Sequence, residues 1–121
     1  MAKVVYVCSA LKGDIKNNKK KAAIYSRKVM ELGYIPYTPH LMFTYFINED
    51  IREEREHALQ MGLEMLPYCN ELWIFGYRIT EGMAAEIRRA RQLGIPVYYK
   101  NVKILDIRIA ERRKQAVKKA A

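Results

Sequence analysis

The stretch Lys3-Val4-Val5-Tyr6-Val7-Cys8 decides the fold of this 121-residue chain. It is a short, continuous apolar run rich in valine, which is typical of a strand buried on both faces. Sheets buried on both faces are mostly parallel, because helices in the connections cover each side. The run therefore predicts the central strand of a parallel sheet.

Helical and strand-like segments alternate along the rest of the chain. The predicted order after the first strand is a helix from 14 to 33, a strand from 34 to 37, a helix from 48 to 66, a strand from 71 to 76, a helix from 80 to 94, a strand from 96 to 99 and a last helix from about 105. Strands joined by connections of helix length predict the α/β class. We expect a flavodoxin-like or Rossmann-like three-layer sandwich with a parallel sheet of four or five strands.

Apolar residues recur at helical spacing on one face of each predicted helix. The residues expected on these buried faces are Ala22, Tyr25, Val29, Leu32, Ala58, Gly62, Met65, Leu66, Met83, Ile87 and Ala90. Between the second strand and the next helix, Pro39 predicts a loop that leaves the sheet. The aromatic-rich stretch from 41 to 47 is either a lid or partner surface, or a loop folded onto the core.

Length and composition favour one domain. Half of the residues are hydrophobic, and no apolar run approaches the roughly 20 residues of a membrane span. The N-terminus runs straight into the first strand without a signal-peptide pattern, so we expect a cytoplasmic protein with no membrane partner. Cys8 and Cys69 have neither the number nor the spacing of a metal site, which predicts buried, reduced thiols and no metal or other cofactor.

The net charge of +9 is concentrated near the C-terminus. Residues 100–121 hold eight Lys or Arg against two acidic residues, which gives +6, whereas residues 1–99 contribute +3. No aromatic-interleaved basic groove or nucleic-acid motif accompanies these charges, so nucleic acid is not the expected partner. A tail that tethers the domain to nucleic acid or protein is one interpretation. A solvated helix packed on the sheet is the favoured one.

The expected ligand site lies beyond the carboxyl ends of the strands, where the strand order of an open parallel sheet reverses. This rule brings together the loops that follow the first three strands. Ser9 and Lys12 can donate to an anion there, and the helix that Thr80 caps offers unpaired backbone amides, which together suit a ligand with a phosphate. Neither GxGxxG nor GxxxxGK[ST] is present, so the usual dinucleotide and nucleoside triphosphate loops are not supported.

One carboxylate stands out at the start of the helix from 80 to 94. Glu86 lies three residues after Met83 and four before Ala90, so we expect it at the margin of the buried helix face. Periodicity alone favours an ordinary solvated glutamate at such a position. Gly82, one turn earlier, lets another group approach the backbone.

Several motifs share the order and spacing of a known family. They are Val5-Tyr6-Val7-Cys8-Ser9 with Lys12-Gly13, Gly33-Tyr34-Ile35-Pro36 with Pro39-His40, Cys69-Asn70-Glu71-Leu72-Trp73, and Glu81-Gly82-Met83-Ala84-Ala85-Glu86 with Ala90 and Gly94-Ile95-Pro96-Val97. Together they resemble the nucleoside 2-deoxyribosyltransferase-like superfamily, which includes the 2'-deoxynucleoside 5'-phosphate N-hydrolases. The resemblance is closest to small uncharacterised bacterial and phage members. The resemblance covers roughly residues 3–99 and implies an α/β domain over residues 1–100. The charge pattern makes 101–121 a basic C-terminal helix that is part of the same domain or a tail.

The resemblance also implies roles for individual residues. Glu86 matches the nucleophile that attacks the anomeric carbon of a deoxyribose, and Tyr6 matches the tyrosine that orients it. The residues expected to bind substrate are Ser9, Lys12, Gly13, His40, Thr80, Gly82 and Met83, with Thr80 and Lys12 at a 5'-phosphate and His40 facing the base. Characterised members assign protonation of the leaving base to an aspartate on the helix before the third strand. Gly62 stands at that position here, with His57 and Glu64 as nearby substitutes.

Two functions follow from this resemblance. The first is cleavage or transfer of the N-glycosidic bond of a nucleoside or nucleotide. The second is non-catalytic binding of a nucleotide-derived ligand in the same pocket, for sensing or sequestration. In both cases the partner is a nucleoside-like or nucleotide-like small molecule. We also expect a homo-oligomer, because members of the superfamily commonly complete the pocket from a neighbouring subunit.

Overall fold

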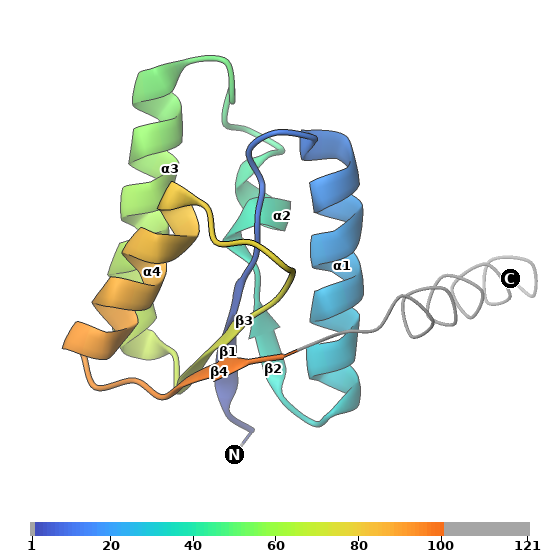
Figure 1. Ribbon diagram of the computed structural model, residues 1–121, viewed down its shortest axis with the longest axis vertical. Coiled ribbons are helices and arrows are strands. Elements are labelled where there is room, and N and C mark those ends of the chain that lie inside the picture. Colours follow the sequence, from blue (N-terminus) through green and yellow to red (C-terminus); the bar gives the residue numbers. More distant parts are fainter. Residues whose placement is uncertain (1, 101–121) are drawn as a thin grey trace, which may run out of the picture.

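The first strand, β1 (Val4–Cys8), lies at the centre of a four-stranded parallel sheet. The computed structural model describes residues 2–100, and Figure 1 shows its helices and strands. The sheet has the order β2-β1-β3-β4, in which β2 is Ile35–Tyr37, β3 is Glu71–Ile74 and β4 is Val97–Tyr99. Every pairing is parallel. The α/β class and the parallel sheet predicted from the sequence are confirmed.

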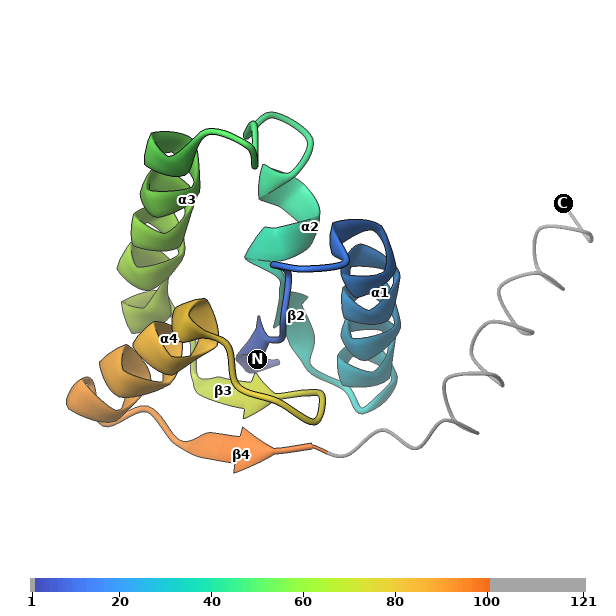
Figure 2. The same ribbon diagram turned by 45° about the horizontal axis from the view of Figure 1, so that its top comes forward.

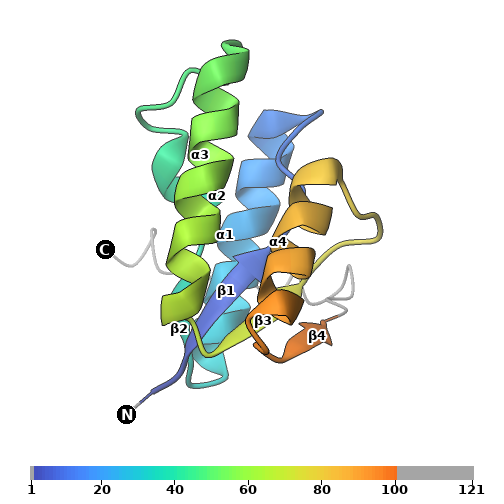
Figure 3. The same ribbon diagram turned by 90° about the vertical axis from the view of Figure 1, so that its left-hand side faces the viewer.

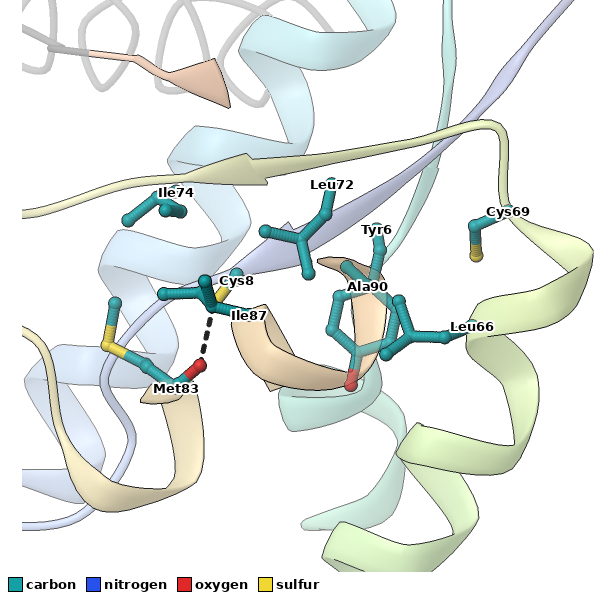
Figure 4. Packing of buried hydrophobic residues seen from close by; sticks show 9 residues of the cluster. All are labelled: Tyr6, Cys8, Leu66, Cys69, Leu72, Ile74, Met83, Ile87 and Ala90. Carbon is teal, nitrogen blue, oxygen red and sulfur yellow. Dashed lines mark hydrogen bonds between the residues drawn. The ribbon is translucent and has the colours of Figure 1, made fainter. Parts of the chain in front are cut away.

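Helices cover both faces of the sheet (Figures 2 and 3). Side chains alternate along a strand, so β1 sends Val5 and Val7 toward one face and Tyr6 and Cys8 toward the other. The valines join Tyr25 and Val29 of α1 (Ile15–Glu31), together with Trp73 and Phe75. Tyr6 and Cys8 join the opposite cluster, which includes Met83, Ile87 and Ala90 of α4 (Glu81–Gln92) and is drawn in Figure 4.

Side-chain caps start the helices α1 and α4. The Asp14 carboxylate accepts from the Asn17 backbone N–H at 3.3 Å, and the Thr80 hydroxyl accepts from the Met83 N–H at 3.3 Å. The Thr80 cap was predicted from the sequence. Gly33, with φ of +92°, ends α1 as expected because a side chain rarely adopts this conformation.

Two residues assigned to buried helix faces are exposed instead. Leu32 is 52% exposed and Met65 is 39% exposed. Leu32 is the residue that follows α1, and Met65 is the last residue of α3 (Arg52–Met65). The helical period no longer fixes side-chain direction at such positions, because the chain is leaving the helix.

The connection between β2 and α3 also differs from the prediction. Pro39 does not lead a loop away from the sheet but starts a short helix, α2 (Pro39–Phe43), where proline needs no backbone N–H partner. In the stretch from 41 to 47, Phe43 is buried on the core, whereas Tyr45 and Phe46 are exposed. The following helix begins at Arg52 rather than 48, and a single 3₁₀ turn (η1, Leu66–Tyr68) ends it.

The predicted last helix from about 105, and the basic segment 101–121, lie outside the described residues. Within residues 2–100, no helix has both the length and the apolar character that crossing a membrane requires.

Candidate functional site

A cavity of about 770 Å³ opens at the carboxyl-end side of the sheet, near the reversal of strand order between β1 and β3. Its walls come from the loop after β1, from α2, from α3 and from the first turns of α4. The predicted site residues that line it are Tyr6, Lys12, His40, Thr80, Gly82, Met83 and Glu86. The cavity therefore lies where the topological rule for open parallel sheets predicts a ligand site.

Glu86 is the buried charge of this site. It is only 2% exposed, which corrects the expectation of a position at the margin of the helix. Met83, Glu86, Ile87 and Ala90 form one buried stripe at the spacing of a core-facing helix. The spacing of the apolar residues in α4 thus already placed position 86 on the buried face. Only the charge of the glutamate argued against its burial.

Both oxygens of the Glu86 carboxylate face a hydrogen-bond donor from β1. The Tyr6 hydroxyl donates to Oε2, and the Cys8 thiol lies 3.6 Å from Oε1. Cys8 Sγ is also 3.9 Å from the Met83 carbonyl oxygen, a contact drawn in Figure 4. These donors compensate part of the cost of placing a carboxylate in the core.

Burial raises the pKa of Glu86 to about 7, and the hydrogen bonds from Tyr6 and Cys8 act in the opposite direction. Burial and the neighbouring Glu86 charge raise the pKa of Tyr6 and of Cys8 well above their usual values. Both side chains therefore stay protonated and remain donors. The result is a carboxyl group that changes charge near neutral pH.

His40 is held by the loop after β1. Its Nε2 lies 2.7 Å from the Ser9 carbonyl oxygen, which can only accept, so Nε2 carries the proton. Burial lowers the pKa of His40, although the bond to Ser9 opposes this effect. A neutral imidazole with an unprotonated Nδ1 is thus presented at the cavity wall.

Ser9 and Gly13 do not line the cavity. Ser9 is buried, and its hydroxyl has no hydrogen-bond partner within residues 2–100. Gly13 has φ of +108°, and a Cβ there would lie 3.2 Å from the Arg78 guanidinium. That guanidinium donates to the Lys12 carbonyl oxygen at 3.3 Å and joins the loops after β1 and β3. Both predicted residues thus lie in the loop that carries Lys12 and not on the cavity wall.

Sequence reasoning missed the wall formed by α3 and the residues before it. Glu49, Arg52, Arg55 and Glu56 line the cavity. The Arg52 Nε is 2.9 Å from Glu56 Oε1, and the Arg55 Nη1 donates to the Glu49 carbonyl oxygen at 2.8 Å. The three- and four-residue spacing places positions 52, 55 and 56 on one helix face, but the sequence does not show that this face meets the cavity.

The helix position expected to carry an acid holds Gly62, which packs against Tyr6. A Cβ at Gly62 would lie 2.7 Å from the Tyr6 hydroxyl oxygen. His57 and Glu64, the nearby substitutes, are exposed and do not line the cavity. Among residues 2–100, no group of three or more His, Cys, Asp or Glu side chains is arranged to hold a metal ion.

Comparisons with known proteins agree with this architecture. The chain is similar to a solved 2-deoxyribosyltransferase from the psychrotolerant bacterium Bacillus psychrosaccharolyticus, with a TM-score of 0.64 and 17% identity over 86% of this chain and 79% of the other. This likeness shows that the fold is of the nucleoside 2-deoxyribosyltransferase type. No curated protein matches the chain. Residues 3–100 match the family described as Domain of unknown function (DUF7768), and the chain belongs to that family.

Proposed function

We propose that this protein cleaves or transfers the N-glycosidic bond of a nucleoside or nucleotide, with Glu86 as the nucleophile. The observation that supports this most is the buried Glu86 carboxylate at the wall of a cavity, with a donor against each oxygen. Structural likeness to a 2-deoxyribosyltransferase supports the same class of ligand.

In the proposed reaction, a Glu86 oxygen attacks the anomeric carbon, and the bond from that carbon to the base nitrogen breaks. The base leaves with the bonding electron pair and takes up a proton. Water or a second base then attacks the same carbon and releases Glu86, so two inversions retain the configuration. The negative charge of Glu86 also stabilises the oxocarbenium-like transition state.

The other cavity residues take supporting roles in this proposal. The Tyr6 hydroxyl fixes the orientation of Glu86. Lys12, Thr80 and the backbone amides at the start of α4 suit an anionic group on the sugar, because unpaired N–H groups favour negative charge. His40 lies on the wall of the same cavity and suits the base.

Protonation of the leaving base is assigned to the side of the cavity near α3, where Glu49 and Glu56 are available. Glu56 is held in an ion pair with Arg52 at 2.9 Å. Partial burial raises the pKa of Glu49, and Arg55 opposes this only in part. We therefore assign the proton donor to Glu49, whose raised pKa favours the protonated form.

Base release from a panel of deoxynucleosides and their 5'-monophosphates, with and without an acceptor base, tests the reaction. We expect release by the wild type and a loss of at least about a thousand-fold in Glu86→Gln. Glu64→Gln, an exposed change on α3 away from the cavity, is the matched control. No release by the wild type, or equal release by Glu86→Gln, would show that the proposal is wrong.

Leaving-group dependence tests the proton donor. We expect Glu49→Gln to slow the release of ordinary bases much more than the release of a 7-methylated purine, which is already cationic and leaves without protonation. Glu56→Gln should show less of this selectivity. An equal effect of Glu49→Gln on both substrates contradicts its assignment as the acid.

Binding without chemistry is the second candidate, and the side chain missing at Gly62 supports it. The same cavity would then hold a nucleotide-derived ligand for sensing or sequestration. Calorimetry with the same panel should show tight binding, and the ligand should be recovered intact. If no compound of the panel binds or raises the melting temperature, both candidates fail.

A further inference from the structure

Gly62 is a glycine whose backbone conformation does not require glycine. The glycines with positive φ within residues 2–100 are Gly13, Gly33, Gly76 and Gly94, and Gly62 is not among them. It lies inside α3, where glycine destabilises a helix relative to alanine. Its presence therefore needs a reason other than φ, and the packing around it supplies one.

The space beside Gly62 is occupied by one atom of Tyr6. A Cβ at position 62 would lie 2.7 Å from the Tyr6 hydroxyl oxygen, a separation that real Cβ atoms essentially never show. The same Cβ would lie 3.8 Å from Tyr6 Cζ and 3.9 Å from Pro39 Cγ, which are ordinary contacts. Only the hydroxyl oxygen thus conflicts with a side chain at this position.

The Tyr6 ring has little freedom to retreat. It is fully buried in the central strand, and it packs against Tyr37 with ring centroids 5.5 Å apart. Its hydroxyl lies between α3 on one side and the Glu86 carboxylate of α4 on the other. A larger residue at 62 would take the space of the hydroxyl, which would have to leave its position between α3 and Glu86.

We propose that Gly62 is a positioning residue, whose missing side chain seats the Tyr6 hydroxyl on the Glu86 carboxylate. A side chain at this position of α3 would compete with the Tyr6 hydroxyl for the same space. Any effect on turnover rests on the proposed function, whereas the hydrogen bond does not.

The ionisation of Glu86 reports on this contact. Within residues 2–100, the titratable groups that act on Glu86 are Tyr6 and Cys8 of β1. Tyr37 of β2 senses the Glu86 charge, and Gly62 brings no titratable group from α3. Losing the Tyr6 hydrogen bond removes an effect that lowers the pKa of Glu86. The midpoint of its titration should therefore move to higher pH.

A double-mutant cycle of Gly62→Ala and Tyr6→Phe tests the proposal, with the Glu86 carboxyl followed by carbon NMR and stability by thermal unfolding. We expect each single variant to raise the titration midpoint of Glu86. Adding Gly62→Ala to Tyr6→Phe should leave the midpoint unchanged, and it should lower the melting temperature less than in the wild-type background. Gly82→Ala, where a Cβ meets nothing within 4 Å, is the control for both measurements.

A purely structural role gives a different result. Gly62→Ala would then lower the melting temperature equally in both backgrounds without moving the titration of Glu86, and this outcome overturns the proposal. If Gly62→Ala alone does not fold, folding of the double variant supports the proposal and its failure contradicts it. The NMR titration needs no turnover, so an inactive wild type overturns the proposed function and leaves this test intact.

Discussion

At Glu86, burial and hydrogen bonding act on the same carboxyl group in opposite directions. Burial favours the neutral form, whereas the donors Tyr6 and Cys8 favour the charged form. Burial has the larger effect, so the pKa rises to about 7. In the proposed reaction Glu86 must be ionised to act as the nucleophile, so base release should rise with pH along an acid limb centred near this value.

The ionisation of Glu86 should also affect the stability of the protein, which should fall as the pH rises. The pKa of Glu86 is about 7 in the folded protein against an ordinary value of 4.5. The stabilising contribution of the protonated Glu86 carboxyl to the free energy of unfolding is therefore fully present below pH 4.5 and is lost as the pH rises through about 7. At 1.36 kcal/mol per pKa unit, the free energy of unfolding should fall by about 3 kcal/mol across this window.

Urea unfolding of the wild type and of Glu86→Gln between about pH 4 and pH 8 measures this contribution. The difference between the two proteins isolates Glu86 from the other carboxylates. We expect the wild type to lose stability relative to Glu86→Gln as the pH rises. A difference that stays constant with pH would mean that Glu86 titrates alike in both states.

At the scale of single elements, capping and apolar period account for much of what the sequence predicts. The strands and the caps at Asp14 and Thr80 follow local rules that tertiary contacts reinforce. The burial of Glu86 could not be weighed from its own helix, because the donors that permit it come from β1. The wall of α3 was missed for a similar reason, since only the fold shows which face meets the cavity.

The cap of α4 gives a prediction at this scale. Thr80→Ala removes the hydroxyl that accepts from the Met83 N–H, so the protein should lose about 1 kcal/mol of stability. Thr80→Ser keeps an acceptor and should retain most of it. Denaturant unfolding at one pH measures both variants, and equal stability of the two would argue against a capping role.

At the scale of the whole molecule, one sheet joins two cores. Trp73 and Phe75 pack with α1 on one face, while Leu72 and Ile74 pack with α4 on the other. Alternate residues of the same strand thus serve opposite layers. Loss of β3 would expose both cores at once, which favours cooperative unfolding.

The single tryptophan offers a test of this cooperativity. Trp73 is buried, and its indole N–H donates to Glu71 at 3.0 Å. We expect its fluorescence to shift to longer wavelength on unfolding, with the same midpoint as the loss of helical circular dichroism. Two separate midpoints would show that the α1 layer and the opposite layer unfold independently.

Self-association is the remaining prediction for the whole molecule. Tyr45 and Phe46 are 84% and 62% exposed beside the cavity-lining α2. Exposed aromatic residues close together are common at protein interfaces. Sedimentation should show a homo-oligomer in the wild type, and Tyr45→Ser with Phe46→Ser should shift it toward monomer. A wild-type monomer at all concentrations would contradict the expectation.

The side chains of β1 alternate between the two faces of the sheet, so an insertion or deletion of one residue in this strand would change which side chains face the site. Tyr6 and Cys8 meet Glu86 only because Val5 and Val7 face the other way. A shift of one residue in strand pairing would exchange the two sets and place valines opposite a buried carboxylate. Misregistered chains would therefore lose the site and the core together. The charge at Glu86 thus disfavours the wrong register during folding, in addition to any chemistry it performs.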